Sequence, residues 1–347
     1  MKHTLKIVIA AGVVLAVLLA LFSRGGSDDN QVTVYSARIE SLVKPLLDEF
    51  ENETGITVNL LTGSGDGLLS RLQQEGRNSP ADVFITVDAG RLQRAKDADL
   101  FKAVESEDLI RNILAHLRDT DNEWFGLSLR ARPIFYAHDR VDPEDLSDYL
   151  SLADSQWRGR ICVRSSDNVY NQSLVAGMIA HHGEEVTEEW VRGLVANFAR
   201  SPVGGDRDQL HAVANGQCDI AIANTYYFGG MTASDDSNNQ ESVAQLSIHW
   251  PAQGEGEQGV HVNVSGIGLL RHAQNEENAI RLMEFLAGAE AQGSYAQRNQ
   301  EYPVRIDAEL SEITQAWGYF RGDDLPISTL GENNAAAVRI MNRAGWR

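Results

Sequence analysis

Cysteine is scarce in this sequence, which has only Cys162 and Cys218 among 347 residues. Their wide separation does not match the short spacing of a redox pair or of a zinc site. In an exported protein two cysteines can form a disulfide. Both of these lie in strand-like segments, "RICVRSS" and "GQCDIAIA", where a buried free thiol is the alternative. The sequence leaves both alternatives open, because pairing depends on the distance between the two Cα atoms.

Basic residues are also few. The chain has 30 Lys and Arg but 49 Asp and Glu, which gives a formal net charge of −19. A surface of this sign repels the phosphates of nucleic acids and of anionic lipids. We therefore expect no nucleic acid partner. Proline is rare as well, with 8 residues, and 43% of the chain is hydrophobic without any long low-complexity run, which is typical of an ordinary folded protein.

The chain has one long apolar run, and it lies near the start. Lys2 and Lys6 precede sixteen apolar residues, 7–22, and the polar stretch "SRGGSDDN" follows them. We interpret residues 1–30 as a linker preceded by a signal peptide, cleaved near residues 20–27, or by an uncleaved tether to the inner membrane. Both alternatives predict that the folded part is exported and periplasmic. The absence of a cysteine after the run disfavours a lipoprotein anchor.

Strand-like and helix-like segments alternate from residue 32 onward, which predicts βαβ units and a mostly parallel sheet. A second set of alternations lies between two long apolar stretches, 123–141 and 260–273, which we expect to cross between two lobes. The predicted fold class is α/β with two lobes, a hinge of crossing strands and a ligand cleft between the lobes. We expect the N-terminal lobe to hold residues 31–130 and 258–307, and the C-terminal lobe to hold residues 131–257 and 308–347.

Three tyrosines follow strands of the second predicted lobe, with Tyr170 in "RSSDNVYNQ" and the adjacent Tyr226 and Tyr227 in "NTYYFGG". Ligands of α/β sheets bind outside the carboxyl ends of the strands, so these phenols should converge at the cleft. Three tyrosines can stack against a ring-containing solute. They can also bind a hard cation such as Fe³⁺, whose three charges three phenolates would cancel.

The sequence resembles the periplasmic ferric-ion-binding proteins of bacterial iron ABC transporters, which belong to the solute-binding proteins. The similarity extends over nearly all of residues 31–347, through segments in matching order: "VTVYSAR", "FENETGITVNLLTG", "PADVFITVDAGRL", "LSLRARPIFYAHDRV", "RICVRSSDNVYNQSLVA", "CDIAIANTYYFG", "HVNVSGIGLL" and "EYPV". The resemblance implies the periplasmic binding protein fold and a monomeric carrier that delivers Fe³⁺ to an inner-membrane ABC permease.

The resemblance also implies roles for single residues. By position, Tyr170, Tyr226 and Tyr227 correspond to iron ligands. Arg130 corresponds to the cation that supports a site anion such as carbonate, and Arg132 is a second candidate for that role.

The chain departs from its relatives at one position of the N-terminal lobe. Where many of them carry a His ligand, often followed by Tyr, this chain has Ile39, which cannot bind a metal, and Glu40. Glu40 is a candidate carboxylate ligand, although a solvated first residue of a helix is the competing interpretation. A second acid of the family is replaced by Val87, and we expect the adjacent Asp88 to cap a helix. These changes favour the subgroup in which three tyrosines hold iron, with water or a small anion completing the shell.

Two other functions compete with ferric binding. The same cleft can bind an organic or phosphorylated small solute, because one fold hosts many ligands. An enzyme has no support in the sequence, which lacks a Ser-His-Asp order, a zinc motif and a nucleophile elbow. We therefore expect a binding protein without catalytic residues.

Overall fold

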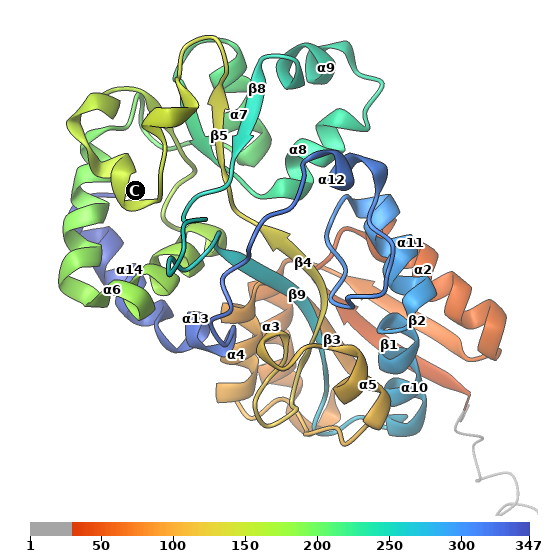
Figure 1. Ribbon diagram of the computed structural model, residues 1–347. Coiled ribbons are helices and arrows are strands. Elements are labelled where there is room, and N and C mark those ends of the chain that lie inside the picture. The colour runs from red at the N-terminus through yellow and green to blue at the C-terminus, as the bar shows by residue number, and fades with distance from the viewer. Residues whose placement is uncertain (1–29) are drawn as a thin grey trace, which may run out of the picture.

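Two lobes, each built around one β-sheet, make up the computed structural model, which describes residues 30–347 (Figure 1). Both sheets are mixed and carry helices on their faces, so the predicted two-lobe α/β fold is confirmed. The predicted signal peptide or tether falls on residues 1–29 and lies outside the described residues. Within residues 30–347, no helix combines the length and the apolar character that a membrane crossing requires.

The larger sheet has five strands, in the order β2 (Thr57–Thr62), β1 (Gln31–Ser36), β3 (Val83–Val87), β9 (Val262–Leu269) and β4 (Phe125–Ala131). β1 pairs in parallel with β2 and β3, as the βαβ pattern predicts. β9 is antiparallel to both β3 and β4, because it brings the chain back from the other lobe. The sheet is therefore less parallel than expected.

Amphipathic helices link and cover these strands. α2 turns one apolar side inward with Val43, Leu46, Leu47 and Phe50, which is the spacing of a single helix face. It ends at Gly55, whose φ of 71° is a left-handed conformation that glycine adopts without strain. The helices of this lobe are α2 (Glu40–Thr54), α3 (Gly65–Glu75), α4 (Ala89–Asp97), α5 (Glu107–Asn112), α10 (Glu276–Leu286) and α11 (Ala289–Asn299).

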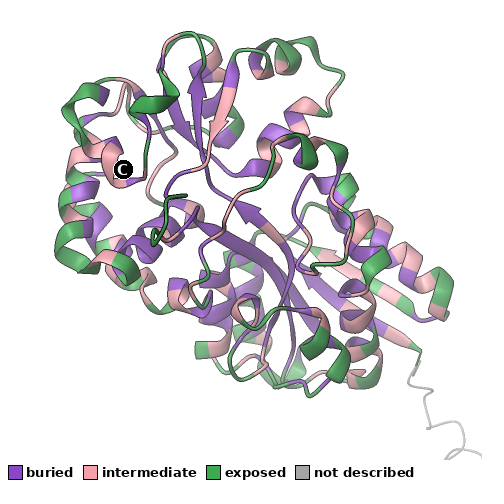
Figure 2. Cartoon of the chain, in the orientation of Figure 1, coloured by how far each residue is buried: buried purple, intermediate pink, exposed green. Residues whose placement is uncertain are grey.

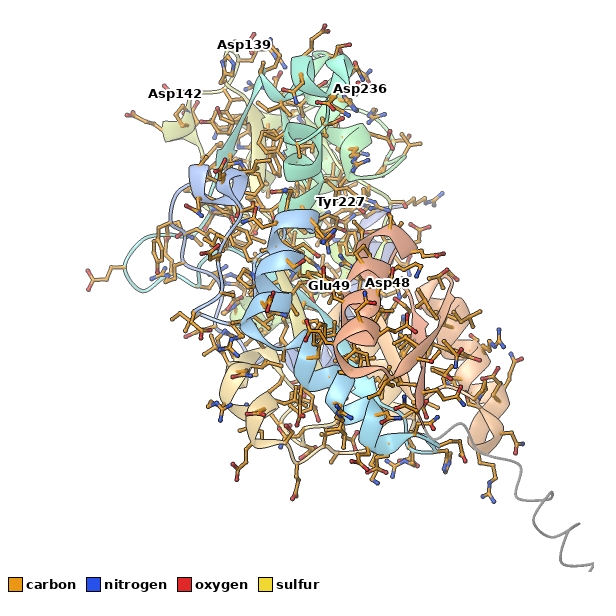
Figure 3. All side chains as sticks on the ribbon, turned by 90° about the vertical axis from the view of Figure 1, so that its right-hand side faces the viewer. Asp48, Glu49, Asp139, Asp142, Tyr227 and Asp236 are labelled. Atoms are coloured by element: carbon orange, nitrogen blue, oxygen red, sulfur yellow. A yellow bond between two sulfur atoms is a disulfide. The ribbon has the colours of Figure 1, made fainter. Side chains whose placement is uncertain are left out.

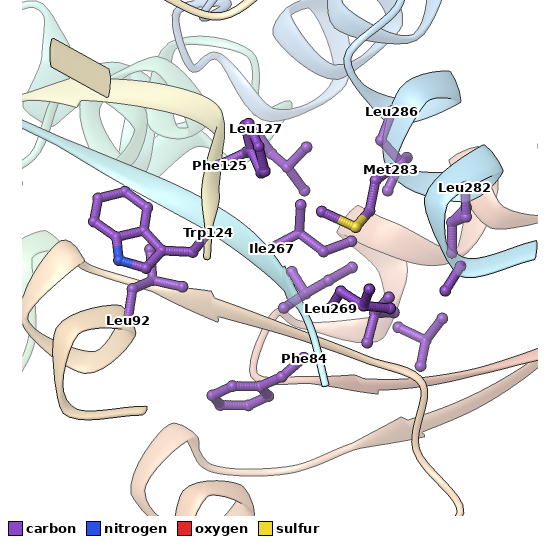
Figure 4. Packing of buried hydrophobic residues seen from close by; sticks show 14 of the residues in the cluster. Phe84, Leu92, Trp124, Phe125, Leu127, Ile267, Leu269, Leu282, Met283 and Leu286 are labelled. Carbon is purple, nitrogen blue, oxygen red and sulfur yellow. The ribbon is translucent and has the colours of Figure 1, made fainter. Parts of the chain in front are cut away.

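The hydrophobic core of this lobe lies between the sheet and its helices. Figure 4 shows Phe84 from β3, Ile267 and Leu269 from β9, and Leu282 and Met283 from α10 packing together. Buried residues follow most of the strands, with the edge strand β2 as an exception, whereas exposed residues gather on the helices and loops (Figure 2). Burial of each large aliphatic or aromatic side chain contributes about 1.5–3 kcal/mol, so the sheet is a rigid support for the turns at its edge.

The smaller sheet has four strands, in the order β6 (Ile161–Cys162), β7 (Ile220–Ile222), β5 (Ile134–Ala137) and β8 (Leu246–His249). β6 and β7 are parallel, so their carboxyl ends meet at one edge. The helices of this lobe are α6 (Val169–Ala196), α7 (Asp206–Ala214), α8 (Thr225–Thr232), α9 (Ser237–Val243) and α14 (Asn334–Ala344). α6 consists of two helices that meet at Gly183, where φ is 78°.

The chain crosses between the lobes where the apolar stretches were expected. β4 belongs to the larger sheet and β5, which begins three residues later, to the smaller one, while β9 returns the chain. A later segment carries α12 (Glu312–Ala316) and α13 (Ser328–Glu332), and α13 packs against both α4 and α6. Short 3₁₀ helices occupy Gly76–Asn78, Ala115–Leu117, Pro143–Asp145, Leu150–Ala153 and Ser155–Trp157.

A disulfide and the packing of α14 stabilise the lobe that carries the three tyrosines. Cys162 and Cys218 form a disulfide with their Cα atoms 6.0 Å apart, which decides between the two alternatives that the sequence leaves open. α14 packs along α6, and beyond it Trp346 is fully buried. The Trp346 indole donates a hydrogen bond to the carbonyl oxygen of Arg164, at 2.9 Å, in the loop that leads to Tyr170.

Candidate metal centre

Three phenols meet where two helices of the C-terminal lobe begin. Tyr170 lies in the first turn of α6, whose N-cap Asn168 accepts a hydrogen bond from the Tyr170 amide at 3.1 Å. Tyr226 and Tyr227 lie in the first turn of α8. The Tyr226 hydroxyl donates to the Tyr170 hydroxyl at 3.0 Å, and the rings of Tyr226 and Tyr227 are 4.3 Å apart. The predicted convergence of the three tyrosines is therefore present.

The tyrosine cluster, Tyr170, Tyr226 and Tyr227, lies at the level where the two lobes meet. Figure 3 places Tyr227 between the upper lobe, which carries Asp139 and Asp236, and α2, which carries Asp48 and Glu49. All three tyrosines are only partly buried. Part of each of these residues is therefore open to solvent.

Burial raises the pKa of the Tyr226 phenol well above its usual range, and the neighbouring Tyr170 and Tyr227 raise it further. Burial also raises the pKa of Tyr227, with further contributions from Tyr170 and Asp206. These two phenols are therefore neutral at physiological pH until a cation binds. A bound cation lowers the pKa of its ligands strongly, so binding would release their protons.

Four arginines surround the tyrosine cluster. The guanidinium carbons of Arg130, Arg132 and Arg164 are 5.7, 5.9 and 5.4 Å from the centre of the Tyr170 ring, and that of Arg207 is 6.0 Å from the Tyr227 ring. This positive field stabilises phenolates and attracts anions.

One terminal nitrogen atom of Arg130 has no hydrogen-bond partner. Its Nη1 donates to the Ser265 hydroxyl at 3.2 Å, whereas its Nη2 is buried, lies 3.6 Å from an Asp88 carboxylate oxygen and makes no hydrogen bond. An unsatisfied buried donor is costly, and an anion bound beside it would remove that cost. This geometry fits the role in anion binding that the resemblance implies for Arg130.

Arg132, the second candidate for that role, is engaged differently. Both of its terminal nitrogens donate to protein oxygens, on Asp206, Asn171, Asn224 and Ile222. Its side chain is 1% exposed. Unlike Arg130, it has no terminal nitrogen left without a partner.

Sequence reasoning did not single out Arg38. This residue follows β1, and its guanidinium forms a two-pronged ion pair with Glu301, with nitrogen to oxygen distances of 3.0 and 2.6 Å. Its Nη1 also donates to Ser265 at 2.8 Å, so Arg38 and Arg130 share one hydroxyl. The charge of Arg38 interacts with Tyr226 as well. Its position in the turn after the first strand was the one available signal.

Glu40 and Asp88, the acids that follow the first and third strands, lie in different surroundings. Glu40 is the exposed first residue of α2, and in the described part of the chain no hydrogen bond or ion pair joins it to the tyrosine cluster. Its role as a ligand stays a prediction. Ile39 beside it is 70% exposed. Asp88 caps α4 by accepting from the Gly90 amide at 3.0 Å, as expected, and also accepts from the Ser173 hydroxyl of α6 at 2.6 Å.

Conventional metal ligands do not gather elsewhere in residues 30–347, where no group of three His, Cys, Asp or Glu side chains is placed to hold a metal ion. The tyrosine cluster is therefore the candidate centre, and its chemistry suits a hard, highly charged cation.

Known proteins resemble this chain over most of its length. A family model of bacterial extracellular solute-binding proteins matches residues 32–297. Iron uptake protein A2 of Synechocystis is 45% identical over 324 residues, which are 93% of this chain and 92% of that protein.

Two solved structures extend the comparison to shape. A Trichodesmium protein in complex with iron and citrate is 42% identical, with a TM-score of 0.88 and coverage of 91% of this chain and 100% of that one. The ferric iron-binding protein A of Mannheimia haemolytica in an open conformation is 42% identical, with a TM-score of 0.85 and coverage of 91% and 99%. The similarity therefore includes both lobes.

Proposed function

Because this chain belongs to the family of bacterial extracellular solute-binding proteins, and three of its phenols form one cluster, we propose that it captures Fe³⁺ for uptake. The proposed ligands are Tyr170, Tyr226 and Tyr227. The observation that carries the proposal is the meeting of the Tyr170 and Tyr226 hydroxyls at 3.0 Å, with Tyr227 packed beside them. Relatives named for iron uptake and ferric iron binding support it.

Charge balance explains why this site would favour Fe³⁺. Three phenolates cancel the charge of the ion, and their hard oxygen atoms match its preference. The remaining coordination positions would go to a site anion such as carbonate beside Arg130, to water, or to Glu40. Citrate, which accompanies iron in the Trichodesmium structure, is another anion of this kind.

The family supports a role for this carrier in transport. We propose that it works in the periplasm, where residues 1–30 have brought it as a cleaved signal or hold it as a tether. The carrier would be a monomer that closes on iron and docks on an inner-membrane ABC permease. Its N-terminal lobe would hold residues 31–130 and 258–307, and its C-terminal lobe residues 131–257 and 308–347. The relatives are named for binding and uptake, which supports a carrier rather than an enzyme.

Ferric iron in a weak chelate should colour the metal-free protein, because phenolate-to-iron charge transfer absorbs visible light. We expect one iron per chain and a band that reaches its maximum at one equivalent, measured by visible absorption and metal analysis. A protein that stays colourless, and is instead protected against unfolding by an organic or phosphorylated solute, would replace this proposal with the competing one.

Replacement of Arg130 by methionine should weaken iron binding by about 10- to 100-fold, the range seen when groups behind metal ligands are removed. Methionine keeps most of the buried volume but removes the charge beside the site anion. The variant should also lose the dependence of iron affinity on bicarbonate, which a titration at two bicarbonate concentrations measures. Equal dependence in variant and parent would contradict a role in anion binding.

A further inference from the structure

The Arg132 guanidinium joins the two helices that carry the tyrosines. It follows β4, at the crossing between the lobes, and its backbone is fixed on both sides. Its amide donates to the His261 carbonyl oxygen at 2.9 Å, and its own carbonyl oxygen accepts from the Tyr149 hydroxyl at 2.8 Å. A guanidinium is planar and presents its donors in a fixed fork. The groups bound to it are therefore held in one geometry.

One prong of the fork reaches the start of α8. Nη1 donates to the Asn224 side-chain oxygen at 2.9 Å. Asn224 is the N-cap of α8, a position where asparagine usually accepts a bond from its own helix. Here it makes no such cap, since its oxygen accepts from Arg132. α8 therefore lacks the hydrogen bond of a side-chain cap. Instead, Asn224, two positions before Tyr226, is bound to Arg132.

The other prong reaches the start of α6. Nη2 donates to the Asn171 side-chain oxygen at 2.6 Å, and Asn171 directly follows Tyr170. The amide nitrogen of the Asn171 side chain donates to the carbonyl oxygens of Arg164 and Ser165, at 3.0 and 3.1 Å. The loop before α6 is therefore fixed to the same guanidinium.

Asp206 balances the buried charge and joins the same network. This residue is fully buried at the start of α7, and its Oδ2 accepts from Arg132 Nη1 at 3.0 Å. The same oxygen accepts from the Asn224 amide at 2.7 Å, while Oδ1 accepts from Arg164 at 3.3 Å. These bonds use both carboxylate oxygens of Asp206 and both terminal nitrogens of Arg132, and they hold the buried ion pair in one geometry.

We propose that Arg132 is a positioning residue for the metal centre, which sets the separation of Tyr170 from Tyr226 and Tyr227 by holding Asn171 and Asn224. This inference rests on the proposed function of the tyrosine cluster. It assigns Arg132 a role other than anion binding, because its terminal donors are used within the protein. A shift of even about 1 Å between ligands matters to a metal site, because small changes in positioning have large effects on chemistry.

The test replaces Arg132 by lysine, which keeps the charge opposite Asp206 but offers a single point donor in place of the fork. A second variant, Asn224→Ala, removes the side-chain bond from Arg132 to the start of α8. It leaves the Arg132 ion pair and the bond from the residue 224 amide to Asp206 in place. In both variants we expect the iron–phenolate band to move in wavelength and iron affinity to fall by about tenfold, the effect of about 1.4 kcal/mol. The double variant should show the same loss as Arg132→Lys alone rather than the product of the two single losses, because Arg132→Lys already removes the link to Asn224.

The matched control is Arg160→Lys, the same substitution in another arginine of this lobe that is paired with an aspartate, Asp219. It should leave the band and the iron affinity unchanged, whatever it does to thermal stability. A wild-type band and wild-type affinity in Asn224→Ala and Arg132→Lys would overturn the positioning role. If Arg132→Lys does not fold, Asn224→Ala alone decides. Absence of colour in the wild-type protein would instead refute the ferric site itself.

Discussion

Replacement of Tyr226 or Tyr227 by phenylalanine should weaken iron retention by at least about 100-fold, so that the protein loses its colour when a chelator competes for the iron. Loss of a direct ligand should exceed the 10- to 100-fold effect of losing a group behind a ligand. The substitution keeps the ring and hence the packing of Tyr226 on Tyr227, whose centres are 4.3 Å apart. Iron affinity is measured by competition with a chelator, and folding by circular dichroism.

Tyr319→Phe is the matched control, since it deletes the same oxygen from a tyrosine that is 92% exposed. It should bind iron like the parent protein. Tyr170→Phe should show an intermediate loss, because water or the site anion can occupy the position that Tyr170 leaves. Parent-like iron binding in both Tyr226→Phe and Tyr227→Phe would remove these residues from the site.

Removal of the disulfide should lower the free energy of unfolding by about 4 kcal/mol. This is the stabilisation expected from the lost chain entropy of the unfolded state when a bond closes a loop of between about 15 and 100 residues. Cys162 and Cys218 are 56 positions apart in the sequence and are both buried. The double variant Cys162→Ala, Cys218→Ala is compared with the parent by denaturant unfolding of the metal-free proteins.

The control is the parent protein after its disulfide has been reduced in the unfolded state. This protein keeps both sulfur atoms but lacks the bond between them. If the effect comes from the loop, this reduced protein and the double variant should lose similar free energy. A loss below about 1 kcal/mol in both would show that the bond contributes little to stability.

Local patterns in the sequence predicted the candidate site well. Strand-like segments before Tyr170 and before Tyr226 placed both residues at one sheet edge, because β6 and β7 are parallel. The helix cap at Asp88 was also predictable, since it acts on an amide of its own turn. Such features depend on a few neighbouring residues, which one sequence displays.

Long-range pairings were not predictable in the same way. Arg38 finds Glu301 across 263 positions, and Arg132 finds Asn224 across 92. No periodicity links residues so far apart, so Arg38 was missed, and the contacts of Arg132, the second candidate for anion binding, could not be foreseen. The disulfide likewise needed the Cα separation of 6.0 Å. The role of Glu40 stays a prediction, because an exposed carboxylate at a helix start fits both of its interpretations.

The position of Trp346 determines when the site can be completed. Translation runs from the N-terminus, so all three tyrosines leave the ribosome well before α14 and Trp346 do. The loop ahead of Tyr170 lacks its hydrogen bond to the indole until then, and α6 lacks the helix that covers it. A nascent chain that already contains all three tyrosines therefore still lacks part of the structure that supports them. The tyrosine cluster therefore acquires its full support only after most of the chain has been made.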